Sequence, residues 1–427
     1  MKTTIYPGDR AARGRFDPDL LLQPAQRVTT PARTLVVACA CTAIIAVAVS
    51  ASAQESRAGT IGAEQAEKAT RLAPRVPSSS EQLLLRAQKI LLEQPDGVYP
   101  YFGSVYSGGG FTLGAGYRRF TGDRTNWNVA GMYSAKNYKL LEGGITSPGH
   151  AAGKIGVRTK AGWRDATQVP FYGLGNDSAK TALATFHMQQ SFAGGDLTFR
   201  PLKHIIILAG ATYEDYTIKS APGDLISIED VYTPATAPGL GENPAYVHTT
   251  IAAGYDWRPG PDYARRGGLY EVALHRYSDR ADTNSFDRLD AQVVQHVPIL
   301  RENWVVSLRG QLQTTLDDAD QVPFFLMPSL GSGSTLRAYS SWRFRDRHSL
   351  LFSGEWRWIP NRLGLDMALF YDAGMVANRL ESLSFSDLIT DFGVGIRFHT
   401  PVATPLRIEI AKGREGLHLV FGGSAAF

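Results

Sequence analysis

Apolar and polar residues alternate with a period of two in the last eighty residues of the chain. Over 391–399, phenylalanine, valine and isoleucine alternate with glycine, arginine and histidine, and the segments that begin near 405 and 416 repeat the pattern. Side chains of a β-strand point alternately to its two faces, so each segment predicts a strand with one apolar and one polar face. In the last segment, alternation places the terminal Phe427 on the apolar face with Leu417, Leu419 and Phe421.

Similar segments recur through most of the chain. Sixteen strands are predicted to begin near residues 110, 126, 137, 152, 181, 192, 204, 246, 267, 284, 302, 347, 364, 391, 405 and 416, and 98–107 is a candidate for a further strand. Most segments reach the roughly nine to eleven residues that a tilted strand needs to cross a bilayer. The pattern predicts an all-β fold, a transmembrane antiparallel β-barrel of about sixteen strands over 98–427, with lipid outside and water or polar side chains inside.

Long connections are predicted at 164–180, 219–245 and 316–346. The last of them contains the glycine- and serine-rich run GSGSTLRAYSSWRFRD. Long loops in compact folds usually carry function, so this loop is the first candidate for a functional element.

The N-terminal part of the chain predicts export. Arg33 precedes an apolar run over 35–49, and the small residues 51–53 then form a cleavage site, which predicts a signal peptide over 1–53. A membrane anchor is the alternative, but the run is short and the cleavage site follows it directly. Residues 54–97 are predicted to hold a polar linker and a short amphipathic helix over 81–93.

Composition excludes several classes of protein. Both cysteines, Cys39 and Cys41, lie in the predicted signal peptide, so the mature chain would have no disulfide and no cysteine ligand. A net charge of +4, without a block of basic residues, argues against nucleic acid as a partner.

Motifs in the C-terminal third resemble the BamA/TamA family of outer-membrane assembly proteins, also called the bacterial surface antigen family. The family's loop tetrad of aliphatic, arginine, glycine and aromatic residues stands here as Leu336, Arg337, Ala338 and Tyr339. Its Phe-x-Asp-x-Gly strand motif matches in full at Phe370, Asp372 and Gly374. The last strand, with Gly422 five residues before Phe427, resembles the family's C-terminal targeting signal.

The resemblance implies that the loop folds into the barrel and that its arginine contacts acidic side chains of the inner wall. Alternation places Glu355, Arg357 and Asp372 on the inner face, and Trp356, Trp358 and Tyr371 on the outer face. A buried guanidinium needs carboxylate partners, so we predict that Arg337 pairs with Asp372 and, as a second partner, with Glu355. Without the resemblance, a solvated loop arginine would be the simpler interpretation.

Three departures from the family pattern change what the resemblance implies. Ala338 replaces the tetrad glycine and is expected to loosen the approach of the loop to the wall. In the terminal signal, Val420 and Ala425 stand where polar and aromatic residues are usual. The segment 54–97 is too short for one of the family's periplasmic POTRA domains, which receive client proteins.

No catalytic motif is present in the sequence. It has no G-x-S-x-G elbow, no H-E-x-x-H and no phosphate-binding loop, so we expect neither an enzyme nor a cofactor. The acidic residues in 317–320 lack the glycine and the distal glutamate of an EF-hand, and a solvated loop is the simpler interpretation; no metal site is expected.

Three functions remain open, all in the bacterial outer membrane with lipid as a partner. The first is insertion or translocation of unfolded outer-membrane client proteins through a weak seam between the first strand (108–120) and the last (416–427). The second is a passive channel for small solutes, lined by Arg118, Glu271, Arg309, Glu355, Arg357, Arg397, Arg407 and Glu409 and partly plugged by 316–346. The third is a structural or adhesive barrel that binds a partner through 219–245.

Overall fold

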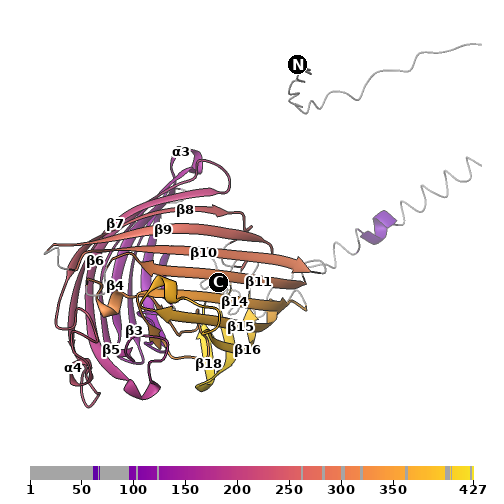
Figure 1. Cartoon of the computed structure of the whole chain (residues 1–427). Coiled ribbons are helices and arrows are strands. Elements are labelled where there is room, and N and C mark those ends of the chain that lie inside the picture. Colours follow the sequence, from indigo (N-terminus) through magenta and orange to yellow (C-terminus); the bar gives the residue numbers. More distant parts are fainter. Residues whose placement is uncertain are drawn as a thin grey trace, which may run out of the picture. The chain divides into compact units, whose positions relative to one another are not determined.

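A computed structural model describes residues 61–65, 67, 96–101, 104–122, 125–260, 263–280, 284–299, 303–317, 321–360, 364–399, 404, 406–423 and 426–427 (Figure 1). The predicted signal peptide and the predicted helix over 81–93 lie outside the described residues. So do Ala425 and residues 318–320.

Sixteen strands of the described residues form one antiparallel sheet. Each strand pairs with its neighbour along the chain, so the sheet is a simple meander that confirms the predicted all-β fold. The strands are β1 (Gly97–Tyr101), β2 (Thr112–Thr121), β3 (Thr125–Ser134), β4 (Lys139–Gly149), β5 (Ile155–Phe171), β6 (Ala184–Phe199), β7 (Ile205–Ser220), β8 (Ala245–Asp256), β9 (Gly267–Asp279), β10 (Phe286–Ile299), β11 (Trp304–Thr315), β14 (His348–Trp358), β15 (Leu365–Ala377), β16 (Ile389–Phe398), β17 (Leu406–Gly413) and β18 (Gly416–Gly422).

Shorter elements lie in the connections between these strands. Strands β12 (Ser329–Leu330) and β13 (Phe344–Arg345) pair with each other inside the connection from β11 to β14. The helical turns are α3 (His150–Gly153), η1 (Lys180–Ala182), α4 (Ile228–Val231), η3 (Phe324–Leu326) and η4 (Leu380–Ser382).

The number of strands agrees with the prediction, but one of the predicted strands is wrong. The strand expected near 181 is β6, which continues through the position of the strand expected near 192. The sixteenth strand is β1, which overlaps the segment that was a candidate for a further strand. Gly194 and Gly195 lie inside β6. A Cβ on Gly194 would lie 2.3 Å from the carbonyl oxygen of Ala211, so this glycine lets β7 approach β6 closely within an unbroken strand.

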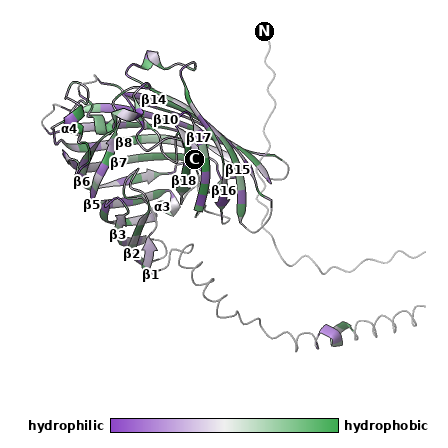
Figure 2. Cartoon of the chain, turned by 90° about the horizontal axis from the view of Figure 1, so that it is seen from below, coloured by the Kyte–Doolittle hydropathy of each residue, from purple (hydrophilic) through white to green (hydrophobic). Residues whose placement is uncertain are grey.

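The sheet curls around an interior, as Figure 1 and Figure 2 show, and its two faces have opposite character. On β11, Leu308 points outward and is 52% exposed, whereas its neighbour Arg309 points inward and is 8% exposed. Apolar side chains cover the outer face in the same way on β16, where Phe392, Val394 and Ile396 are exposed. Among the described strands, β1 pairs only with β2 and β18 only with β17.

The two ends of the sheet differ in the length of their connections. The start of β1 and the end of β18 lie at the end with the shorter turns, and the connections 172–183, 221–244 and 316–347 lie at the other.

The loop predicted over 164–180 begins later than expected. β5 continues to Phe171 through a register shift between Ala166 and Val169, which hides the alternation.

The interior at the long-loop end is apolar, which corrects the expectation of a polar interior throughout. Phe324 of η3 packs against Phe171 of β5 and Phe186 of β6, with ring centroids 5.0 and 4.9 Å apart. Loop residues such as Phe324 and Phe325 fold inward and are buried, so the wall around them must also be apolar. Further along the inner wall, charged side chains such as Glu355, Arg397 and Glu409 are buried.

Candidate functional site: an arginine on an inward-folded loop

The connection from β11 to β14 folds into the interior as a small hairpin. Strands β12 and β13 pair Ser329 with Arg345 and Leu330 with Phe344, and the segment 331–343 forms the tip. Leu330 lies against Gly374 of the Phe-x-Asp-x-Gly motif, where a Cβ would come within 2.8 Å of its Cδ1 atom. The motif glycine therefore provides the space into which the hairpin fits.

Arg337 lies at the tip of this hairpin and is 1% exposed. Its Nε donates to Oδ2 of Asp372 at 2.7 Å, and its Nη2 donates to Oδ1 of the same carboxylate at 3.1 Å. Its Nη1 donates to Oε2 of Glu355 at 3.2 Å. The structure thus brings together the three predicted residues, and the contact with Asp372 has the bidentate geometry that favours arginine over lysine.

The face of the Arg337 guanidinium is covered by Phe370, the first residue of the strand motif. The Cζ atom lies 3.5 Å from the ring centroid, within the range of a cation–π contact. Burial by itself lowers the pKa of Arg337, but Asp372, Glu355 and Glu409 together raise it above its ordinary value. The group therefore stays charged although it is removed from water.

Glu409 of β17 is a partner of Arg337 that the sequence analysis missed. Its Oε1 accepts from Nη1 of Arg337 at 3.1 Å and from Nη2 of Arg397 at 2.7 Å. Arg397 also donates to both oxygens of Glu355, and Arg407 donates to Oε2 of Glu409 at 2.9 Å. Alternation had placed Glu409, Arg397 and Arg407 on the inner face, but not beside Arg337.

The result is a buried network that links the loop to four strands. Its core holds three guanidinium groups and three carboxylates, and Arg357 adds a longer ion pair with Glu355 at 3.8 Å. A carboxylate or guanidinium that lost its partner here would be left as an isolated buried charge, which costs about 3–5 kcal/mol. The members of the core are Arg337, Arg397, Arg407, Glu355, Asp372 and Glu409.

Wall side chains also bind the backbone of the loop. Arg309 donates to the carbonyl oxygen of Ser334 at 2.7 Å, and Arg407 donates to that of Gly333 at 2.8 Å. On the other side of Arg337, the backbone N–H of Ala338 donates to Oδ2 of Asp391 at 3.0 Å. These bonds fix the loop on both sides of its arginine.

Ala338 does not loosen the loop, contrary to expectation. It is 5% exposed, and among the described residues it is not one of those with a positive φ, so an alanine fits its backbone without strain. The close approach falls on the next residue. The ring of Tyr339 lies over Gly413, where a Cβ would come within 2.9 Å of it.

The end of the chain corrects another prediction. Leu417, Leu419 and Phe421 point outward as expected, but the ring of Phe427 lies 4.8 Å from Cζ of Arg309, an inward-facing residue. β18 ends at Gly422, so alternation no longer applies beyond it. Gly422 itself pairs with Arg407, and a Cβ there would come within 3.0 Å of the Arg407 guanidinium.

The end of the tip segment, next to β13, connects the two edges of the sheet at the long-loop end. Arg343 forms an ion pair with Glu415 in the turn between β17 and β18, at 2.8 Å. The indole Nε1 of Trp342 donates to the carbonyl oxygen of Ser107, between β1 and β2, at 2.9 Å. The loop therefore contacts both edges although their strands do not pair in the described part of the chain.

A turn crosses the interior at the opposite end. The turn 257–266 connects β8 and β9, but Tyr263 donates to Oδ2 of Asp366 on β15 at 2.6 Å. Its ring stacks on His399 with a centroid distance of 4.1 Å, and Arg357 of β14 donates to the carbonyl oxygen of Ala264. Because β10 and β11 separate β9 from β14 in the sheet, these contacts span the mouth of the barrel.

Comparison with known proteins finds a family match for the C-terminal part of the chain and a similar fold for most of it. Residues 266–422, which include the loop, Asp372 and Glu409, match the model of the Omp85 superfamily domain. The fold is similar to that of BamA from Haemophilus ducreyi lacking POTRA domains 1–3, with a TM-score of 0.57 and 15% identity over 77% of this chain and 69% of that one. The C-terminal part of the chain thus matches an Omp85 superfamily domain, and the fold is that of an outer-membrane β-barrel.

A second solved structure has a similar fold. CdiB from Escherichia coli matches with a TM-score of 0.51 and 12% identity, over 77% of this chain and 59% of that one. A search of the curated proteins found no match. At these identities the likeness is one of fold, so the role of this barrel must be argued from its own residues.

The outer face of the barrel fits a membrane with the short turns on the periplasmic side. Exposed aromatic side chains gather near that end, as is typical of the membrane interface. They include Trp127, Phe199, Tyr255, Trp257, Tyr270, Trp304, Trp358 and Phe398. None of the helices among the described residues is long and apolar enough to cross a membrane.

Proposed function

We propose that this Omp85 barrel inserts or translocates unfolded outer-membrane proteins, with the edges of β1 and β18 as the site of action. The observation that carries the proposal is that, in the described part of the chain, each of these strands pairs on one side only. An unpaired edge presents backbone N–H and C=O groups that can add a further strand. A client strand would satisfy them there while its apolar side chains enter the lipid.

The seam in this proposal differs from the one that the sequence suggested. The first strand of the sheet is β1 (Gly97–Tyr101), and β2, expected at the seam, is paired on both sides. Both edge strands are short, with five and seven residues. Short edges limit unwanted association while leaving a template for an incoming strand.

The loop connects the seam to the arginine network. Trp342 and Arg343 of the tip segment contact Ser107 and Glu415 on either side of the seam. Arg337 of the same segment is held by Asp372, Glu355 and Glu409. The network would therefore set the position of the hairpin that bridges the two edges. In this account Arg337 has a structural role and takes no part in a reaction.

The test is to lock the seam chemically. Val98→Cys on β1 and Leu419→Cys on β18, both at exposed positions, would be joined with a flexible bismaleimide in a chain with Cys39 and Cys41 replaced by serine. The readout is the rate at which a client barrel protein acquires its heat-modifiable folded form in proteoliposomes. We expect the locked protein to fall to the rate of empty liposomes.

A matched control uses a pair of strands inside the sheet. Leu141→Cys and Trp163→Cys are directly opposite on β4 and β5 and also point outward. The same crosslinker at this pair should leave the rate unchanged. Full activity with the seam locked would reject the proposed mechanism.

A passive solute channel is the second candidate, and the polar inner wall favours it. Glu271, His275 and Asp290 help to line a cavity of about 260 Å³ on the inside of β7–β11. The inward-folded loop residues around Phe324 and Phe325 block the interior at one end, and Tyr263 blocks it at the other. Conduction would need both to move. Single-channel conductance that rises after deletion of 321–346 would support a channel, and silent bilayers before and after deletion would reject it.

A further inference from the structure

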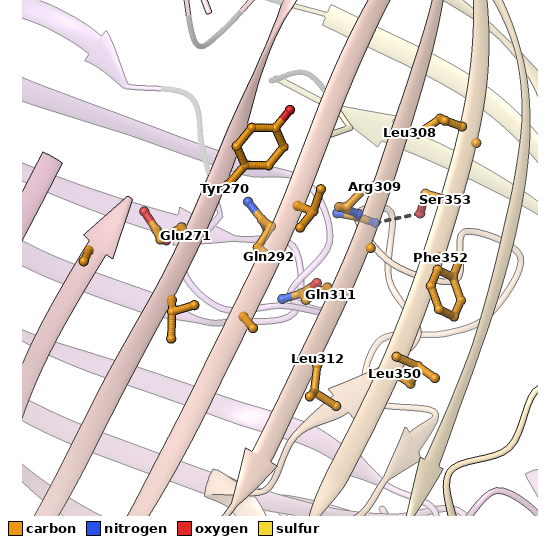
Figure 3. A pocket seen from close by; sticks show the side chains of 16 residues that line it. Tyr270, Glu271, Gln292, Leu308, Arg309, Gln311, Leu312, Leu350, Phe352 and Ser353 are labelled. Carbon is orange, nitrogen blue, oxygen red and sulfur yellow. Dashed lines mark hydrogen bonds between the residues drawn. The ribbon is translucent and has the colours of Figure 1, made fainter. Parts of the chain in front are cut away.

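The outer face of the barrel is not evenly covered. A groove of about 790 Å³ crosses the wall from β8 to β14 (Figure 3). Its rim consists of Tyr270, Val272, Leu308, Leu312, Leu350 and Phe352, and most of its lining is apolar. The polar residues that border it are Glu271, Gln292, Arg309, Gln311 and Ser353. The groove exists because the residues between these side chains are small, among them Ala291, Gly310 and Gly354.

Gly310 and Gly354 lie on the floor of the groove, and the space above both of them is open. A Cβ on Gly310 would meet only the ring of Phe352, at 3.7 Å, and a Cβ on Gly354 would have Leu308 at 3.8 Å as its nearest neighbour. Both are ordinary van der Waals distances. The glycines are therefore not needed for strand packing, unlike Gly194 or Gly374, and their effect is to leave the groove empty of protein atoms.

The groove slants through the apolar part of the wall. Tyr270 lies three residues from the start of β9, near the periplasmic end, whereas Leu350 lies two residues from the start of β14, near the opposite end. Neighbouring strands are about 4.8 Å apart, so the four spacings from β8 to β14 give a length of roughly 19 Å. The groove is thus long, narrow and open towards the lipid.

The floor of the groove offers no backbone hydrogen bonds. Each strand from β8 to β14 is paired on both sides, so its backbone groups are already used. A polypeptide strand in hydrocarbon would have to satisfy its own backbone elsewhere. An acyl chain has no such groups, and its contact with the floor and rim is pure dispersion and apolar burial.

We infer that the groove is a binding site for one acyl chain of a phospholipid of the periplasmic leaflet. The site is continuous with the lipid-facing surface and begins at Tyr270, whose hydroxyl donates to Oε1 of Gln295 at 2.5 Å. This polar pair lies close to the aromatic belt, where the ester and headgroup of a phospholipid would be. The acyl chain then runs along the groove and lies between the side chains of Tyr270 and Phe352.

The inference is independent of the proposed seam. β8 to β14 occupy the middle of the sheet, and neither edge strand belongs to the groove. A phospholipid held here would be retained by the folded barrel whether or not the barrel inserts proteins. The experiment can therefore succeed or fail without deciding the proposed function.

The test fills the groove with protein atoms. Gly310→Leu and Gly354→Leu place a branched side chain on the floor, where the added Cβ meets no atom closer than 3.7 Å. Gly131→Leu is the matched control, because Gly131 also faces outward, on β3, and a Cβ there has nothing closer than 4.0 Å. Each protein is reconstituted in vesicles of phosphatidylethanolamine and phosphatidylglycerol that contain chain-labelled phosphatidylcholine.

The readouts are the motionally restricted fraction of the spin-labelled chains and the phospholipid that survives delipidating detergent in native mass spectrometry. We expect the wild type and Gly131→Leu to retain a phospholipid and to show the restricted component, and both groove variants to lose them with unchanged heat-modifiable folding. Equal retention in all four proteins would overturn the inference, and so would a stoichiometric co-purified polypeptide that the groove variants release.

Discussion

Arg337 and Glu409 are separated by 72 residues in sequence and are joined by a hydrogen bond of 3.1 Å from Nη1 to Oε1. Glu409 lies on β17, one strand from the edge of the sheet, while Arg337 lies on the loop that precedes β14. The same carboxylate binds Arg397 and Arg407. The last strands of the barrel and the loop thus depend on one buried network.

Removal of the guanidinium should release the loop while leaving the barrel folded. Arg337→Ala leaves Asp372 without either of its bonds from Arg337, at a cost of about 3–5 kcal/mol to the docked loop. Limited proteolysis in membranes should then cut within 316–347 while the heat-modifiable barrel band persists. Arg337→Lys should be cut at an intermediate rate, and unchanged resistance in Arg337→Ala would remove the proposed anchoring role.

Replacement of both partners should be milder than replacement of one. Asp372→Leu alone leaves Arg337 with only its weaker partners, whereas Arg337→Met with Asp372→Leu replaces a buried ion pair by apolar atoms, which is often nearly neutral. We expect the double variant to resist cleavage of the loop better than either single variant. Strictly additive losses would mean that the two residues stabilise the loop independently.

Gly374 is expected to be needed for docking of the loop. A Cβ at this position would come within 2.8 Å of Leu330 and 2.9 Å of the carbonyl oxygen of Leu350. Gly374→Val should therefore displace the hairpin and expose 316–347 to protease. Gly131→Val, on an open part of the wall, is the control and should behave as the wild type.

Tyr263 is expected to close the periplasmic mouth. In a single-cysteine chain with Ser307→Cys, a residue buried near Arg357, a membrane-impermeant maleimide should react slowly. Loss of a hydrogen bond to a charged group is worth about 1.5–3 kcal/mol, so Tyr263→Phe should speed labelling about tenfold or more, and Tyr263→Ala further. Tyr270→Ala, at a lipid-facing tyrosine, should leave the rate as it was.

Alternation predicted the faces of the strands well because it depends only on local geometry. Glu355, Arg357 and Asp372 point inward, and Trp358 and Tyr371 outward, as predicted. The family motif added what alternation lacks, the pairing of Arg337 with Asp372. Neither alternation nor the family motif could place Glu409 in the network. Its side chain crosses Gly395, and a Cβ on Gly395 would lie 2.6 Å from Cγ of Glu409. That contact depends on the register of β16 and β17.

Two other misses have the same origin in long-range contacts. Phe427 lies beyond the end of β18, where no strand fixes its side, and it finds the guanidinium of Arg309. The turn around Tyr263 is rich in proline and glycine, and its sequence indicates a simple reversal of the chain. Its packing against Asp366 and His399 depends on how far the sheet curls, which local patterns do not encode.

The position of the loop inside the barrel can be measured directly by a disulfide between Gly333→Cys at the hairpin tip and Val420→Cys on β18. A Cβ on Gly333 would lie 4.0 Å from Cβ of Val420, within the range of disulfide geometry. In membranes, with Cys39 and Cys41 replaced, this pair should oxidise and hold the fragments together after cleavage in 316–347. Gly333→Cys with Phe421→Cys, which faces lipid, should not. Absence of a bond in the first pair, or equal yields in both, would contradict an inward-folded loop.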